Sequence, residues 1–115
     1  MTTRRLEHWA ADAGARDVVR LDIPADAARD RTFEIDVRLV VRTARTDATH
    51  AMQVRVDGAL EWSRSLPTHP GGDSLDLRLR RTVARGRPLR LAATCTLRGA
   101  LRVSLSIVAD EVPED

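Results

Sequence analysis

The segment Leu75–Ala109 reads LDLRLRRTVARGRPLRLAATCTLRGALRVSLSIVA, and it decides the fold. Apolar and polar side chains alternate along it with a period of two, as in its opening LDLRLR. A period of two places one set of side chains on each face of an extended strand. The segment therefore predicts three β-strands that each have one apolar face. It indicates a fold class and leaves the function open.

The same alternation recurs earlier in the chain, at residues 18–23 and 32–42 and on both sides of Asp57-Gly58. We expect seven or eight strands, and their connections are too short for parallel crossovers, which need a dozen or more residues. Strands with one apolar face pack as two sheets, so we expect an all-β fold. It would be a single antiparallel β-sandwich of immunoglobulin-like or jelly-roll type. A small closed β-barrel is the alternative.

The length of 115 residues suits a single domain, which we expect to span residues 1–115. Within the N-terminal arm, residues 1–16, the spacing fits either a short helix that ends at Gly14 or a strand over residues 6–10. The acidic tail, residues 111–115, is expected to be frayed. The absence of tyrosine and of a Cys…Trp…Cys pattern disfavours a true immunoglobulin domain.

A β-hairpin is predicted around Asp57-Gly58, a dipeptide that suits a tight turn between strands. A two-residue loop would place the apolar groups of the two strands on opposite faces. A three-residue loop over residues 56–58 would instead pair Val54 with Leu60 and Met52 with Trp62, with all four on one face. We therefore expect the three-residue loop and a positive φ at Gly58.

Two further features of the strands can be predicted. The last two strands are expected to form a hairpin around Arg98-Gly99-Ala100, in which an odd-length loop would keep Cys95 and Val103 on one side. The consecutive residues Val40 and Val41 break the alternation of their strand, which indicates a bulge or burial on both faces. On the same strand Glu34, Asp36 and Arg38 alternate with apolar residues. We expect these to form a solvated face with cross-strand arginine partners.

The basic residues are all arginine, 19 in number, and they are interspersed with 17 acidic residues to give a net charge of +2. This arginine-rich composition is typical of a GC-rich bacterial genome. The single cysteine excludes an intramolecular disulfide. The chain shows no apolar run that resembles a secretory signal or a membrane span. We expect a cytoplasmic protein with no membrane contact.

Candidate chemistry is sparse. His50, His69 and Asp73 lie near expected strand ends and are the weak candidates for a metal site. The irregular loop over residues 66–73 is where an enzymatic or metal site would lie. Cys95 is in the inward phase of its strand, where a thiol is unreactive. No nucleophile elbow or phosphate-binding loop is present. We therefore expect no enzymatic activity and no cofactor.

A dense cluster of arginines follows one predicted strand and its turn: Arg78, Arg80, Arg81, Arg85, Arg87 and Arg90. Such a basic patch suits phosphate contacts. The chain has only one phenylalanine and two tryptophans, so it offers few aromatic platforms on which bases or sugar rings could stack. This shortage disfavours both nucleic acid and carbohydrate. Carbohydrate binding is common among β-sandwiches, so we place it ahead of nucleic acid.

A protein-interaction surface is the remaining hypothesis. Val18, Val40 and Val108 are apolar residues in outward phases, and if clustered they would mark an interaction surface. Sandwich domains also expose strand edges that can pair with other chains. We expect a non-catalytic binding or assembly module that recognises a protein partner or, as a homo-oligomer, itself. A carbohydrate-binding sandwich is the alternative, and an enzyme or metal site at residues 66–73 is third.

Overall fold

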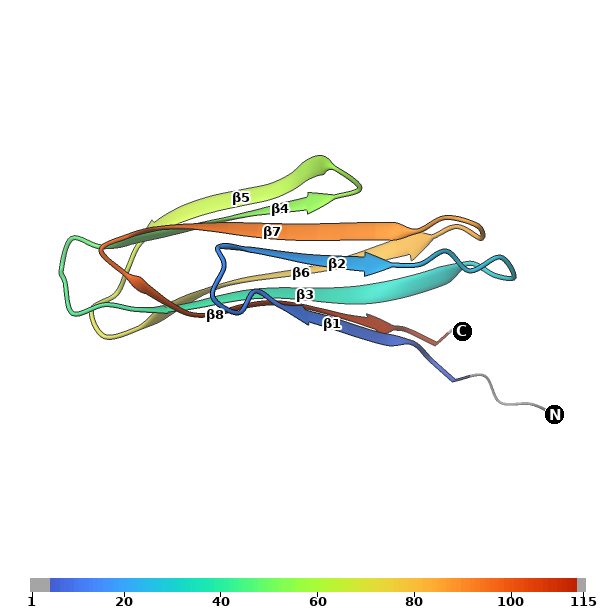
Figure 1. Ribbon diagram of the computed structural model, residues 1–115, viewed down its shortest axis with the longest axis horizontal. Coiled ribbons are helices and arrows are strands. Elements are labelled where there is room, and N and C mark those ends of the chain that lie inside the picture. Colours follow the sequence, from blue (N-terminus) through green and yellow to red (C-terminus); the bar gives the residue numbers. More distant parts are fainter. Residues whose placement is uncertain (1–4, 114–115) are drawn as a thin grey trace.

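The computed structural model describes residues 5–113, which form eight strands and no helix. The strands are β1 (His8–Asp12), β2 (Val18–Ile23), β3 (Arg31–Arg42), β4 (Thr49–Val56), β5 (Ala59–Pro67), β6 (Asp73–Val83), β7 (Leu89–Arg98) and β8 (Leu101–Glu111). They build two antiparallel sheets that lie face to face (Figure 1). Sheet A has the order β1-β8-β3-β6, and sheet B has the order β2-β7-β4-β5. The predicted antiparallel β-sandwich is confirmed, and the sheets do not close into a barrel.

The first and last elements of the described chain are strands. Of the two alternatives for the N-terminal arm, the strand is correct, although β1 covers His8–Asp12; it pairs with β8, and Gly14 lies in the turn that follows. The first part of the expected frayed tail is also ordered. Glu111 ends β8, and the backbone N–H of Val112 donates to the carbonyl oxygen of Thr32 at 2.8 Å. Residues 114 and 115 lie outside the described residues. Among residues 5–113 there is no helix with the length and apolar composition to cross a membrane.

The chain crosses between the sheets at almost every connection, and only β4 and β5 are consecutive strands that pair. The prediction that the last two strands form a hairpin is therefore wrong, because β7 belongs to sheet B and β8 to sheet A. A hairpin within one sheet and a crossing between two sheets give the same alternation in the sequence. Here Cys95 and Leu105 both reach the core, one from each sheet.

The β4–β5 turn differs from the predicted three-residue loop. Asp57 (φ 51°) and Gly58 (φ 85°) both have positive φ, which defines a two-residue type I′ turn. Past the turn, Arg55 pairs with Leu60 and Val54 with Trp62, so Glu61 is an extra residue that forms a bulge. This bulge returns Trp62 to the core side and leaves Leu60 outside, 51% exposed. The positive φ of Gly58 was expected, but it fits both loop types.

A second bulge lies beside Val40 and Val41, but it is on β8 and not on β3, which alternates without a break and was the strand in which a bulge or two-sided burial was expected. The pairing of β3 with β8 shifts between Val40 and Val41, and Val103 is the extra residue on β8. Beyond the bulge the phase of β8 reverses, so Val103 is 57% exposed and Arg102 turns inward. The expectation that Val103 shares the inward side with Cys95 is therefore wrong.

The core fills the space between the sheets. Every second residue of β3 is buried from end to end, and the fully buried side chains include Phe33, Ile35, Leu39, Met52 and Ile107. Each such side chain contributes about 1.5–3 kcal/mol relative to an exposed one. The two long sides of the sandwich differ, because β1 packs against β2 whereas β5 and β6 make no comparable contact. On the β5–β6 side four inward residues remain half-buried: Trp62, Leu66, Leu77 and Leu79.

Candidate functional site

The outer face of sheet A is a self-neutralised ladder of ion pairs. Arg80 lies opposite Glu34 on the neighbouring strand, with Nη2 to Oε1 at 2.6 Å. Arg78 lies opposite Asp36 in the same way, at 3.6 Å. The expected cross-strand pairing of these acids with arginines is therefore confirmed. The chemical consequence is that Arg78 and Arg80, the first members of the predicted basic patch, have their charges balanced within the sheet.

The remaining arginines of the basic patch do not extend this face. Arg81 is in the inward phase and pairs with Glu61 of β5 across the open side of the sandwich. Arg85 lies in the β6–β7 turn, where its backbone N–H donates to Asp30 at 2.7 Å. Arg87 and Arg90 belong to the other end of that turn. The structure thus distributes the six arginines over several surfaces.

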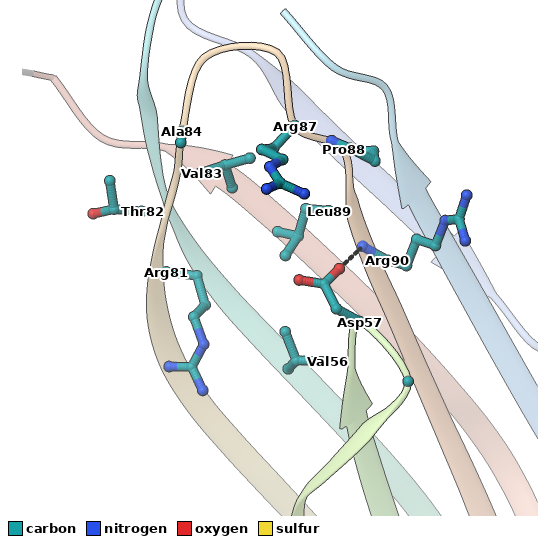
Figure 2. A pocket seen from close by; sticks show the side chains of 11 residues that line it. Val56, Asp57, Arg81, Thr82, Val83, Ala84, Arg87, Pro88, Leu89 and Arg90 are labelled. Atoms are coloured by element: carbon teal, nitrogen blue, oxygen red, sulfur yellow. Dashed lines mark hydrogen bonds between the residues drawn. The ribbon is translucent and has the colours of Figure 1, made fainter.

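An open cleft of about 680 Å³ lies at the end of the sandwich, between the β4–β5 and β6–β7 turns. Its apolar lining comes from Val56, Val83 and Leu89, and Arg81 and Arg87 contribute charge (Figure 2). The Arg90 side chain points away from Leu89, toward the outside of sheet B (Figure 2). Arg81 is paired with Glu61 of β5, and Asp57 also lines the cleft, so part of its positive charge is balanced.

The three candidate metal ligands lie in or beside the loop over residues 66–73. Asp73 accepts backbone N–H groups from His69 at 3.0 Å and Ser74 at 2.9 Å, and these bonds lower the pKa of its carboxyl. His50 is fully buried, with Nδ1 2.7 Å from the hydroxyl of Thr68. Its Nε2 has no hydrogen-bond partner within the described residues. Among residues 5–113 no three His, Cys, Asp or Glu side chains could together hold a metal ion.

The only cysteine is inward, as predicted, and Cys95 is 4% exposed. Burial is the largest cause that raises the pKa of its thiol, followed by the opposing effect of a hydrogen bond with Arg102. Asp17 lies 3.7 Å from the sulfur and also pairs with Arg102. A neutral, buried thiol is a poor nucleophile.

The three valines of the expected interaction surface do not come together. Val40 and Val108 share the outer face of sheet A, where the row that pairs Arg38 with Ser106 separates them. Val18 pairs with Thr94 in sheet B, so it lies on the opposite face of the sandwich. The structure thus gives no shared patch for Val18 with the other two.

A different surface stands out on the free edge of β6. Residues 73–83 pair only with β3 and do so in unbroken register, so the other side of β6 presents unpaired backbone groups. Leu77 and Leu79 face inward from this edge yet stay half-buried. Sequence reasoning treated this segment as a source of arginines and did not consider its edge. The alternation of apolar and polar residues along this segment is the signal that could have pointed to the edge.

The outer face of sheet B was also missed. We call it the arginine–hydroxyl face, and its residues are Arg20, Arg55, Arg90, Arg98, Ser63, Ser65, Thr94, Thr96 and Gln53. Within residues 5–113 no acidic side chain lies within ion-pair distance of its four arginines. The face therefore differs from the outer face of sheet A, where charges are paired.

Comparison with known proteins gives a fold and no family. No protein-family model matches the chain, and no curated protein matches it. The structure is similar to part of dimeric latent PorU from Porphyromonas gingivalis, with a TM-score of 0.58 and 13% identity. That match covers 87% of this chain and only 10% of the other, so this chain spans about a tenth of it. A weaker likeness, with a TM-score of 0.34 and 14% identity, is to a protein of the T13 IBDV viral particle; it covers 96% of this chain and 36% of that one.

Proposed function

We propose that this protein is a non-catalytic assembly module and that its β6 edge pairs with the β6 edge of a second copy. One observation carries the proposal, namely that β6 is complementary to itself when two copies run antiparallel about Leu77. In that register Leu77 faces its own counterpart and Leu75 faces Leu79. On the outer face Asp76 lies opposite Arg78, and this pair occurs twice because the arrangement is two-fold symmetric.

The pairing also continues the ion-pair ladder of sheet A. Within one copy Arg78 lies beside Asp36, and Asp76 lies beside Arg38 at 3.3 Å. Across the proposed junction the row would read Asp36, Arg78, the second copy's Asp76 and the second copy's Arg38, so that the charge alternates at each step. The next rows pair Ser74 with Arg80 and Asp73 with Arg81. No like charges meet anywhere in this register.

The β6 edge has fewer of the devices that usually block such pairing. It contains no proline and no bulge over residues 73–83. Its two inward-phase charges, Asp73 and Arg81, lie toward the two ends of the strand and would face each other across the junction. By contrast, the free edge of β5 carries the bulge at Glu61, the inward-phase Arg64 and the terminal Pro67. Bulges, inward charges and prolines are the features by which natural sheets protect their edges. The difference favours β6 as the edge that accepts another strand.

The expected affinity is modest. Opposite-charge and apolar cross-strand pairs contribute about 0.2–1 kcal/mol each. Covering the half-buried Leu77 and Leu79 adds apolar burial. These terms oppose the loss of translational and rotational freedom on association. We therefore expect a dimer that dissociates on dilution.

Charge exchange tests the register. Sedimentation equilibrium at micromolar to millimolar concentration should give a dimer for the natural protein and a monomer for Asp76→Arg, which would oppose two arginines twice. Arg78→Asp should likewise be a monomer. The fourfold exchange Asp36→Arg/Arg38→Asp/Asp76→Arg/Arg78→Asp reverses the whole row, so every pair within and between copies is restored, and it should dimerise again.

A matched control separates this effect from a change in net charge. Asp110→Arg reverses a charge on the same face but on β8, which is not an edge strand, and should leave the dimer intact. A natural protein that stays monomeric at millimolar concentration would overturn the proposal. So would single variants that dimerise as well as the natural protein.

A further inference from the structure

The arginine–hydroxyl face is a broad surface of small polar side chains. Its central rows carry Thr94 between Gln53 and Val18, and Thr96 beside Ala51. Ser63 and Ser65 continue these rows onto β5. None of these side chains is large, so backbone and hydroxyl groups across all four strands stay close to a ligand laid on the sheet.

Arginines lie at both ends of the arginine–hydroxyl face, and the small polar residues between them form a platform. Arg20 and Arg55 flank Ala92 in one row, and adjacent strands are about 4.8 Å apart, so the two arginines stand about 10 Å apart across the sheet. Arg98 lies six residues from Ala92 along β7, about 20 Å away at 3.4 Å per residue. The platform therefore has cationic groups at each end and neutral hydrogen-bonding groups between them.

Arginines outnumber acidic residues on the arginine–hydroxyl face. Asp22, which pairs with Arg90 in the sheet register, is the one acidic residue in the described strand rows of the face, and no ion pair joins the two. Four arginines against one aspartate give a net charge of +3 in a protein whose total is only +2. The rest of the molecule is therefore close to neutral, and an anionic ligand would be drawn to this face.

From these features we propose that the arginine–hydroxyl face binds an extended acidic glycan, a linear polysaccharide whose sugars carry carboxylates. Guanidinium groups bind carboxylates in a two-pronged geometry. The Ser, Thr and Gln side chains donate to and accept from sugar hydroxyls. The proposal goes beyond dimerisation, because it uses the opposite sheet and needs only one copy of the chain.

The composition of the face favours this ligand over other polymers. A neutral glycan is usually held by aromatic stacking, and neither tryptophan lies on this face, because Trp9 is on β1 and Trp62 packs against the core. Duplex DNA carries one charge about every 1.7 Å and is bound by neutralising many phosphates. Three net charges spread along about 20 Å suit a more sparsely charged chain with many hydroxyls.

The test measures binding by isothermal titration calorimetry with a defined oligogalacturonate at low ionic strength. We expect saturable binding that weakens with salt, and no binding of a maltodextrin of equal length. Arg20→Ser/Arg55→Ser should weaken binding at least tenfold. Gln53→Glu, nearly isosteric at the centre of the platform, should weaken it severalfold.

The matched control is Arg42→Ser/Arg85→Ser, which removes the same charge from β3 of sheet A and from the β6–β7 turn, away from both proposed surfaces. It should leave binding unchanged. An equal loss in this control would mean that net charge alone attracts the ligand and would overturn the assignment. Duplex DNA that binds as tightly as oligogalacturonate, or no uronate binding at all, would also overturn it. The Asp76→Arg monomer should bind a short oligogalacturonate normally, so failure of the dimer does not decide this result.

Discussion

Arg31 and Glu7 form an ion pair at 2.8 Å that ties the start of the described chain to the start of β3. The Arg31 side chain is almost fully buried, lies 5.4 Å from the ring centre of Phe33, and also donates to the carbonyl oxygen of Pro24 at 2.8 Å. Glu7 accepts from Arg29 as well, at 2.9 Å. A buried charge is tolerated here because several partners surround it.

Removing Glu7 should therefore be costly. Glu7→Ala leaves the buried Arg31 guanidinium without its carboxylate, and we expect a loss of about 3 kcal/mol in the free energy of unfolding, the lower end for a broken buried pair. Urea denaturation monitored by tryptophan fluorescence measures this loss. Glu34→Ala removes an equally formed but exposed pair with Arg80 and should cost no more than about 1 kcal/mol. Equal costs for the two variants would contradict the distinction.

The β4–β5 turn gives a prediction about backbone strain alone. Gly58 has a φ of 85°, and a Cβ added there would meet no atom within 4 Å. Gly58→Ala should thus cost about 1–2 kcal/mol through conformation and not through a clash. Gly72 has no positive φ, and its added Cβ would make ordinary contact with the Val41 carbonyl at 3.5 Å. Gly72→Ala should be neutral or slightly stabilising in the same urea experiment.

The turn also shows what the sequence could not decide. Asp57-Gly58 predicted a hairpin correctly, but the choice between loop lengths assumed an unbroken ladder beyond it. The bulge at Glu61 supplies the extra residue that the predicted loop was meant to provide. The three-residue loop and the two-residue turn followed by a bulge both place Trp62 on the core side. The side on which Trp62 lies therefore cannot distinguish them.

For a related reason, the sequence could not show which of the two sheets each strand joins. Alternation tells which residues of a strand face the core, and it correctly placed Cys95 and Ile107 inside. It says nothing about which of the two sheets a strand joins. The arginine–hydroxyl face depends on that assignment, because Arg20 and Arg55 become neighbours only when β2, β7 and β4 share sheet B. Clustering in the sequence identified Arg78 and Arg80 instead, and these are paired with acids.

Asp73 should make the free energy of unfolding depend on pH in the acidic range. Backbone N–H groups of His69 and Ser74 lower its pKa in the folded state, so its contribution is complete above the unfolded value of about 3.9 and is lost as the pH falls through the lower folded value. Asp73→Asn should thus be less stable than the natural protein near neutral pH, and the difference should shrink as the pH falls below the unfolded value of about 3.9. Urea midpoints measured across that range test this. A difference that does not change with pH would show that the carboxylate charge is unimportant to the loop.

The two proposals together predict bivalent binding. A two-fold axis through opposed Leu77 residues runs perpendicular to the extended sheet A, so both copies of sheet B would lie on the same side of it and turn their arginine–hydroxyl faces the same way. A long polyuronate could then engage both faces at once, whereas a short oligomer could reach only one. The Asp76→Arg monomer should lose at least tenfold in apparent affinity for the long polymer and nothing for the short one. The fourfold exchange Asp36→Arg/Arg38→Asp/Asp76→Arg/Arg78→Asp should recover the long-polymer affinity. Equal losses for both ligand lengths would show that the β6 edge itself contacts the glycan.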